Sequence, residues 1–86
     1  MADDLKARFE QASVDVKALT ERPSDSDMLA LYALYKQATE GDATGNKPGF
    51  FDFVGRAKYE AWEELKGLDA DEARQRYIDK VRSLGA

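Results

Sequence analysis

Apolar residues recur at spacings of three and four along most of the chain, which is the period of an amphipathic helix. Residues 3–19 carry one narrow apolar stripe, formed by Leu5, Phe9, Ala12, Val16 and Leu19. Residues 24–40 carry a wider apolar and aromatic face, formed by Met28, Leu31, Tyr32, Leu34, Tyr35 and Ala38. No segment alternates with a period of two, so the pattern predicts an all-α protein.

Proline and glycine divide the chain into four such segments. Pro23, residues 41–49 and Gly67 separate predicted helices over residues 3–19, 24–40, 52–67 and 69–84. N-caps are expected at Asp3 or Asp4, Ser24, Asp52 and Asp69, and Glu72 completes a capping-box pattern. We therefore expect residues 1–86 to form one domain, a four-helix bundle. The connection over residues 42–51 is long for a helix-to-helix link, and such loops are often functional.

The charge balance excludes some classes of partner. The formal net charge is −4, with 17 acidic and 13 basic residues. This argues against a nucleic-acid-binding protein and against general attraction to anionic lipid surfaces. No apolar run is long enough to cross a bilayer, and the first ten residues resemble neither a signal nor a transit peptide. We expect a cytoplasmic monomer without stable membrane insertion.

The residues needed for most covalent chemistry are absent. The chain has no histidine and no cysteine, which removes the commonest general base, metal ligand and strong nucleophile. Acidic pairs such as Glu63 and Glu64 are sequence neighbours, and neighbours on a helix point in different directions. We expect no catalytic residue, no metal site and no cofactor.

Aromatic residues and lysines form two strips at helical spacing. Tyr32, Tyr35, Lys36 and Thr39 lie on the second predicted helix, and Lys58, Tyr59 and Trp62 lie on the third. Each strip alone is more typical of core aromatics with lysines extended beside them. Together, in an acidic protein, they favour a site for a nucleotide: tyrosine offers a flat face and a hydroxyl, and lysine suits phosphate.

The same residues resemble a known family. The chain runs Leu31-Tyr32-Ala33-Leu34-Tyr35-Lys36-Gln37-Ala38-Thr39 and continues with Gly41-Asp42, Pro48-Gly49, Gly55-Arg56-Ala57-Lys58, Ala61-Trp62, Leu65-Lys66-Gly67 and Tyr77-Ile78. This closely resembles the acyl-CoA-binding protein family, from Phe9 to Leu84. The resemblance implies an up-down-down-up four-helix bundle that binds thioesters of coenzyme A with medium and long fatty acids. It also implies an intracellular acyl-CoA pool, delivered to acyl-CoA-using enzymes.

The resemblance also implies roles for particular residues. Those expected at the adenine and 3′-phosphate of coenzyme A are Tyr32, Tyr35, Lys36 and Lys58, supported by Tyr77. Arg22, just before the proline, is a further expected phosphate contact. The residues expected in the acyl-chain groove are Ser13, Val16, Met28, Leu29 and Val54.

Three residues depart from the family pattern. Tyr59 stands where many members have tryptophan, Val54 replaces a residue that is often basic, and Ser13 stands where alanine is common. Val54 could extend the apolar groove, and Ser13 puts a hydroxyl beside the expected chain path. These departures bear on chain-length preference.

Two other functions are compatible with parts of this pattern. The first is a helical protein-interaction module without a lipid ligand, in which the aromatics are purely structural. The second is an enzyme of acyl-CoA metabolism, which the missing catalytic residues disfavour. The sequence leaves the preferred chain length and the recipient enzymes open.

Overall fold

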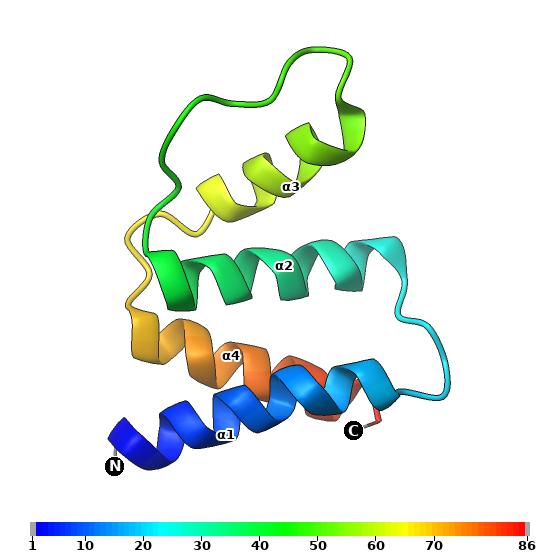
Figure 1. The fold of residues 1–86 in the computed structure, drawn as a ribbon, viewed down its shortest axis with the longest axis vertical. Helices are drawn as coiled ribbons and strands as arrows, with labels where there is room; N and C mark the ends of the chain where they lie inside the picture. The colour runs from blue at the N-terminus through cyan, green and yellow to red at the C-terminus, as the bar shows by residue number, and fades with distance from the viewer. Residues whose placement is uncertain (1, 86) are drawn as a thin grey trace.

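Four α-helices account for most of the chain in the computed structural model, which describes residues 2–85 and side-chain surroundings from residue 4 onward (Figure 1). They are α1 (Ala2–Asp15), α2 (Asp25–Glu40), α3 (Phe53–Glu63) and α4 (Ala70–Ser83), and a short 3₁₀ turn, η1 (Val16–Ala18), extends α1. The described residues contain no strand, which confirms the all-α prediction. Within residues 2–85, no helix combines the length and apolar character needed to cross a membrane.

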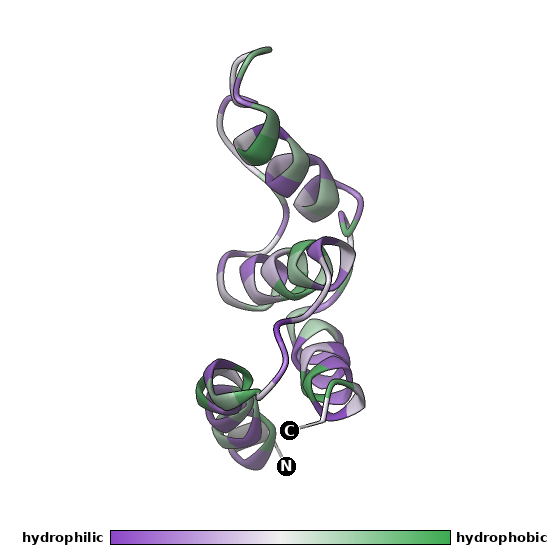
Figure 2. Ribbon diagram, turned by 90° about the vertical axis from the view of Figure 1, so that its right-hand side faces the viewer, coloured by the Kyte–Doolittle hydropathy of each residue, from purple (hydrophilic) through white to green (hydrophobic). Residues whose placement is uncertain are grey.

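The helices run up, down, down and up. In Figure 1, α1 and α4 run in one direction, whereas α2 and α3 both run in the other. Helix α2 is central, because it packs against α4 on one side and α3 on the other, while α1 packs against α4. The Cα positions extend over 38 × 30 × 15 Å, so the molecule is flat, and α3 lies at one end of its longest axis (Figures 1 and 2).

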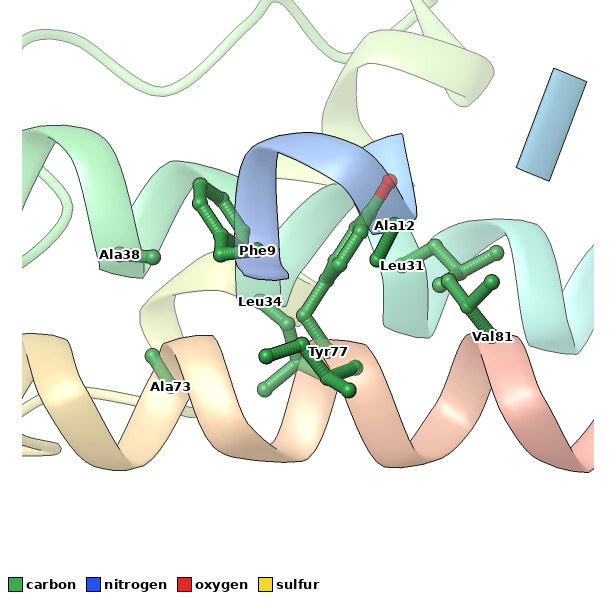
Figure 3. Packing of buried hydrophobic residues seen from close by; sticks show 9 residues of the cluster. Phe9, Ala12, Leu31, Leu34, Ala38, Ala73, Tyr77 and Val81 are labelled. Carbon is green, nitrogen blue, oxygen red and sulfur yellow. The ribbon is translucent and has the colours of Figure 1, made fainter. Parts of the chain in front are cut away.

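The main core lies among α1, α2 and α4 (Figure 3). Its buried members are Phe9, Ala12, Leu31, Leu34, Ala38, Ala73, Tyr77, Ile78 and Val81. The ring of Phe9 meets that of Tyr77 edge to face, with centroids 5.1 Å apart, and Val16 packs against the same cluster. The first and fourth helices thus pack through the stripes that the sequence predicts. Helix α3 adds no buried residue to this cluster, and its one buried side chain is Trp62.

Three of the predicted N-caps are present, whereas Asp3 and Asp4 lie inside α1, which already includes Ala2. Ser24 Oγ accepts from the backbone N–H of Asp27, an Asp52 carboxylate oxygen from that of Gly55, and an Asp69 carboxylate oxygen from that of Glu72. These bonds satisfy backbone donors that the first turn leaves free. The capping box at Asp69 is only half formed, because the Glu72 carboxylate binds Arg76 instead.

Two helix ends differ from the prediction. The α-helix predicted to reach Leu19 ends at Asp15 and tightens into η1. The helix predicted to reach Gly67 ends at Glu63, and the chain continues in turns whose backbone bonds span three residues, from Leu65 N–H to Trp62 O and from Lys66 N–H to Glu63 O. Apolar periodicity persists through a 3₁₀-like turn, so the pattern alone overestimates both lengths.

The long connection over residues 41–52 is anchored to α3. Trp62 Nε1 donates to the carbonyl of Gly41 at 2.8 Å, the Tyr59 hydroxyl donates to that of Gly45 at 3.2 Å, and Lys47 pairs with Glu60 at 3.0 Å. These contacts hold the loop along α3 and fix where α3 begins.

Asp42 joins the end of α2 to the turn before α4. One of its carboxylate oxygens accepts from the Gly67 backbone N–H and from Gln37 Nε2, each at 2.8 Å. The Gly67 bond first, and then the Gln37 bond, hold the pKa of Asp42 below its usual value. Gln37 is buried and also donates to the carbonyl of Leu68. This polar junction ties the α3–α4 connection to the end of α2.

Candidate functional site

Two lysines from different helices lie over aromatic rings at the α2–α3 contact. Lys58 Nζ of α3 stands 5.3 Å from the ring centroid of Tyr32 on α2. Lys36 Nζ of α2 stands 4.9 Å from the ring centroid of Trp62 on α3. Both distances suit a cation–π interaction. The fold therefore brings together the two strips that the sequence places on separate helices.

The two lysines differ in their ionic partners. Lys36 pairs with Glu40, one helical turn further along α2, and this bond raises the pKa of Lys36 above its usual value. Lys58 is exposed, and it makes no ion pair with any residue in the described range 4–85. An incoming anion thus meets one free cation and one that a carboxylate already holds.

Tyr35 presents an open ring on an aromatic base. Its side chain is 43% exposed, yet its ring stacks on Phe9 of α1, with centroids 5.5 Å apart. Tyr77 of α4 lies behind, 6.0 Å from the Tyr35 ring, and is itself buried. Burial first, and then the nearby Tyr35, raise the pKa of Tyr77 above its usual value. Three helices therefore hold Tyr35 while leaving one part of it accessible to a planar ligand.

The outlying polar residues make local contacts. Arg22 lies in the α1–α2 connection, is exposed, and stands 3.9 Å from the Asp25 carboxylate. Thr39 donates its hydroxyl proton to the carbonyl of Tyr35 in the same helix. Tyr59, where the family often has tryptophan, contacts Trp62 edge to face and anchors the loop through Gly45. Among the described residues, no hydrogen bond or ion pair joins any of these three to Lys36 or Lys58.

A cleft of about 480 Å³ is lined by facing parts of α2 and α3. Its lining is mostly small or aliphatic, and comprises Leu29, Ala30, Ala33, Leu34, Ala57, Ala61 and Leu65, with Ser26, Glu60 and Glu64. Leu29 lies three residues before Tyr32 and seven before Lys36, so it shares their side of α2. Ala61 lies three residues after Lys58 and shares its side of α3 in the same way. Leu29 and Ala61 therefore connect the lysine–aromatic strips to the cleft.

Of the residues predicted to line an acyl groove, only Leu29 borders this cleft. Ser13 donates its hydroxyl proton to the carbonyl of Glu10 within α1, and Val16 packs against the core. Met28 is exposed on α2, and Val54 is exposed at the start of α3. These four residues lie on α1, η1, α2 and α3, and their place in an acyl-chain groove stays a prediction.

Comparison with known proteins assigns the family. The family model described as "Acyl CoA binding protein" matches residues 6–81. The chain belongs to the acyl-CoA-binding protein family. It is 48% identical over 81 residues to "Acyl-CoA-binding protein homolog" of Manduca sexta, a match that covers 93% of this chain and 90% of that protein. The crystal structure of Oryza sativa Acyl-CoA-Binding Protein 2 superimposes with a TM-score of 0.88 at 41% identity, covering 93% and 89% of the two chains.

One relative carries an enzyme's name. The chain is 53% identical over 78 residues to rat "Enoyl-CoA delta isomerase 2", but this covers 91% of the chain and only 20% of that protein. The similarity is thus to one segment of a much longer protein. The match therefore gives no basis for assigning isomerase activity to this chain.

In this member of the acyl-CoA-binding protein family, three features of the site were not anticipated from the sequence. Glu40 binds Lys36, a contact that the spacing of four residues could have indicated. Phe9 lies under Tyr35, although its stripe predicted only a core role. The α2–α3 cleft depends on alanines that face each other across two helices, which no single-helix pattern reveals.

Proposed function

We propose that this protein binds medium- and long-chain fatty acyl-CoA thioesters and carries them without chemical change. The observation that supports this most strongly is the pair of lysine–aromatic contacts, Lys58 with Tyr32 and Lys36 with Trp62, at one helix–helix junction. Such a junction offers positive charge and flat apolar surface together, which a phosphorylated nucleotide needs. Membership of the acyl-CoA-binding protein family agrees with this ligand class.

In this proposal the head of coenzyme A lies across α2 and α3. The open face of Tyr35 and the ring of Tyr32 receive the adenine, with Tyr77 holding Tyr35 from behind. Lys36 and Lys58 receive the 3′-phosphate. Arg22 is exposed in a connection and pairs with Asp25 at 3.9 Å, an interaction weak enough to yield to a phosphate.

The acyl chain enters between α2 and α3 in the same proposal. It passes Leu29 and Ala61 and occupies the cleft of about 480 Å³. That volume lies within the range of small-molecule sites, and alanine and leucine line most of it. Each methylene that leaves water contributes about 0.8 kcal/mol, so chain length should set much of the affinity. Leu29 is common to this path and to the groove predicted through Ser13, Val16, Met28 and Val54.

The biological setting extends the same proposal. A protein that lacks histidine and cysteine and binds an activated fatty acid suits storage and delivery better than catalysis. We propose a monomeric cytoplasmic carrier that passes acyl-CoA to the enzymes that use it, with no cofactor of its own.

Calorimetry with matched ligands tests the function. Palmitoyl-CoA should bind at least about a hundredfold more tightly than palmitate, because two charge-assisted phosphate contacts are each worth about 1.5 to 3 kcal/mol. The alternative is a helical protein-interaction module, which predicts no saturable binding of either ligand. Equal affinity for the two ligands would instead indicate that the protein binds fatty acids in general and does not recognise coenzyme A. Product analysis after incubation checks that the thioester stays intact.

A further inference from the structure

Four of the five residues at positions 50–54, around the start of α3, are apolar and exposed. The side chains of Phe50, Phe51, Phe53 and Val54 are 70%, 84%, 70% and 67% exposed. Single exposed apolar residues are common, but a contiguous group of three phenylalanines and a valine is not, and such patches mark interaction sites. We call residues 50–54 the aromatic tip. It is not part of the core cluster and does not line the α2–α3 cleft.

The aromatic tip lies at one extremity of the molecule. Helix α3 occupies one end of the longest axis, and its first turn lies at that end of the ribbon (Figure 1). In Figure 2, which looks at the end of the molecule where α2 and α3 begin, hydrophobic colouring marks the start of α3. A flat surface can therefore meet the tip without first touching α1 or α4.

Local bonds hold the tip in shape. The Asp52 backbone N–H donates to the carbonyl of Gly49 at 3.0 Å, and the Asp52 carboxylate caps the Gly55 N–H at 3.0 Å. The rings of Phe50 and Phe51 meet edge to face, with centroids 5.4 Å apart. The phenylalanines are thus already ordered in an exposed arrangement, and docking costs little further ordering.

Basic residues flank the tip within an acidic protein. Residues 43–60 contain Lys47, Arg56 and Lys58 against Asp52 and Glu60, a net charge of +1. The chain as a whole carries −4, so the remaining residues carry −5. The Arg56 guanidinium lies 5.9 Å from the Phe50 ring centroid, directly beside the apolar surface. The acidity of the whole chain disfavours general attraction to anionic lipids, but the net charge of residues 43–60 is positive.

We propose that the aromatic tip docks on the interface of an anionic phospholipid bilayer. Phenylalanine and valine side chains at residues 50–54 enter the boundary between head groups and acyl chains. Lys47 and Arg56, which both pair with the part-exposed Glu60 in the free protein, at 3.0 and 3.5 Å, exchange that carboxylate for lipid phosphates. The contact is shallow and reversible, because only four side chains enter. A second copy of the chain is a poorer occupant, since two tips in contact would bring their positive charges together. The acidic remainder of the molecule orients it away from the surface.

Vesicle co-sedimentation tests the docking. The wild-type protein should bind vesicles of equal parts phosphatidylcholine and phosphatidylserine, and bind phosphatidylcholine alone more weakly. The double variant Phe50→Ser/Phe51→Ser should lower the affinity for the mixed vesicles at least about tenfold. Val14→Ser is the control, because Val14 is an apolar residue, 59% exposed, on α1 and outside the tip. It should bind like the wild type.

A position-specific label gives a second readout. The chain has no cysteine, so Phe51→Cys and Val14→Cys each provide one site for an environment-sensitive dye. The dye at position 51 should shift its emission to the blue on mixed vesicles, and the dye at position 14 should not. Raised salt should reverse the shift, because the lipid charges are then screened.

Three results would overturn the proposal. They are no binding of wild type to mixed vesicles, equal binding by the double variant, or equal dye responses at both positions. A response at position 51 to an acyl-CoA-using enzyme but not to vesicles would also overturn it, in favour of a protein partner. The test is independent of the proposed function, because the double variant should keep the wild-type affinity for palmitoyl-CoA in lipid-free solution.

Discussion

Lys36 makes two contacts at the proposed site and shares its helix face with a third residue of that site. It pairs with Glu40, lies over Trp62, and shares the α2 strip with Tyr32. The sequence identified this lysine by its spacing and by the family resemblance, but it could not reveal the competition between Glu40 and an incoming phosphate. Two predictions follow from the residues around this ammonium group.

The first concerns recognition of the 3′-phosphate. Lys36→Ala should weaken palmitoyl-CoA binding by about 1.5 to 3 kcal/mol, because a charge-assisted contact is lost. It should affect the analogue without the 3′-phosphate much less. Calorimetry of both proteins with both ligands at one salt concentration gives the coupling energy. Lys36→Met preserves most of the stem and is the companion variant. A coupling energy near zero would reject direct phosphate recognition by Lys36.

The second concerns Glu40. Glu40→Gln should tighten palmitoyl-CoA binding by about 0.2 to 1 kcal/mol, since it frees Lys36 and removes a negative charge beside the phosphate site. Glu63→Gln makes the same charge change on an exposed residue of α3 and should alter the affinity less. Titration calorimetry compares the two. Weaker binding by Glu40→Gln would mean that Glu40 positions Lys36 rather than competing for it.

At the scale of elements, single residues decide where helices begin and how they pair. Lys80 of α4 binds the carboxylate of Asp27 in the first turn of α2, with Nζ and Oδ1 2.5 Å apart. The Lys80 bond first, and then the Ser24 bond, hold the pKa of Asp27 below its usual value. The stability of the α2–α4 interface should therefore depend on pH.

The sign of this dependence follows from the lowered pKa. The pair stabilises the fold above the ordinary pKa of aspartate, and this stabilisation is lost as pH falls through the lowered pKa. Asp27→Asn should therefore lose stability at about pH 7 and show a smaller drop than wild type between about pH 7 and about pH 3. Urea unfolding at both pH values measures this. Asp79→Asn, which removes an exposed carboxylate without breaking the pair, is the control. Parallel profiles for wild type and Asp27→Asn would show that the pair contributes nothing.

The sequence predicts beginnings better than ends. Helix starts are indicated by Ser24, Asp52 and Asp69, because an N-cap needs only one side chain that accepts a hydrogen bond from a nearby backbone N–H. The tightened ends after Asp15 and Glu63 carry the same apolar spacing as true helix, so pattern cannot separate them. The α2–α3 cleft and the aromatic tip depend on where α3 settles, which the loop anchors decide. Val54 lies in that tip and is exposed, and its predicted place beside the acyl chain stays a prediction.

At the scale of the whole molecule, the helices are unequally supported. Helix α4 packs against both α1 and α2, whereas the main neighbour of α3 is α2 alone. Because α3 adds no residue to the core cluster, it should open at a lower free energy than α1, α2 and α4. The ligand proposed to bind between α2 and α3 should raise the free energy of opening α3 toward that of the other helices.

Hydrogen exchange measures this directly. Without ligand, the backbone amides of α3 should exchange fastest among the four helices, apart from frayed ends. Palmitoyl-CoA should slow exchange in α3 more than in α4. Coenzyme A without an acyl chain should protect α3 less, because the cleft stays empty. Uniform protection of all four helices by palmitoyl-CoA would argue against an acyl chain held between α2 and α3.

The one-sided support of α3 also bears on how long a ligand stays. If the acyl chain fills the cleft, its release requires α3 to move away from α2. The loop, which Tyr59 and Trp62 anchor to α3, then limits that movement. Residence time then reflects the opening rate of one helix as well as the length of the fatty acid. A carrier built this way can hold its cargo tightly and still release it within a useful time.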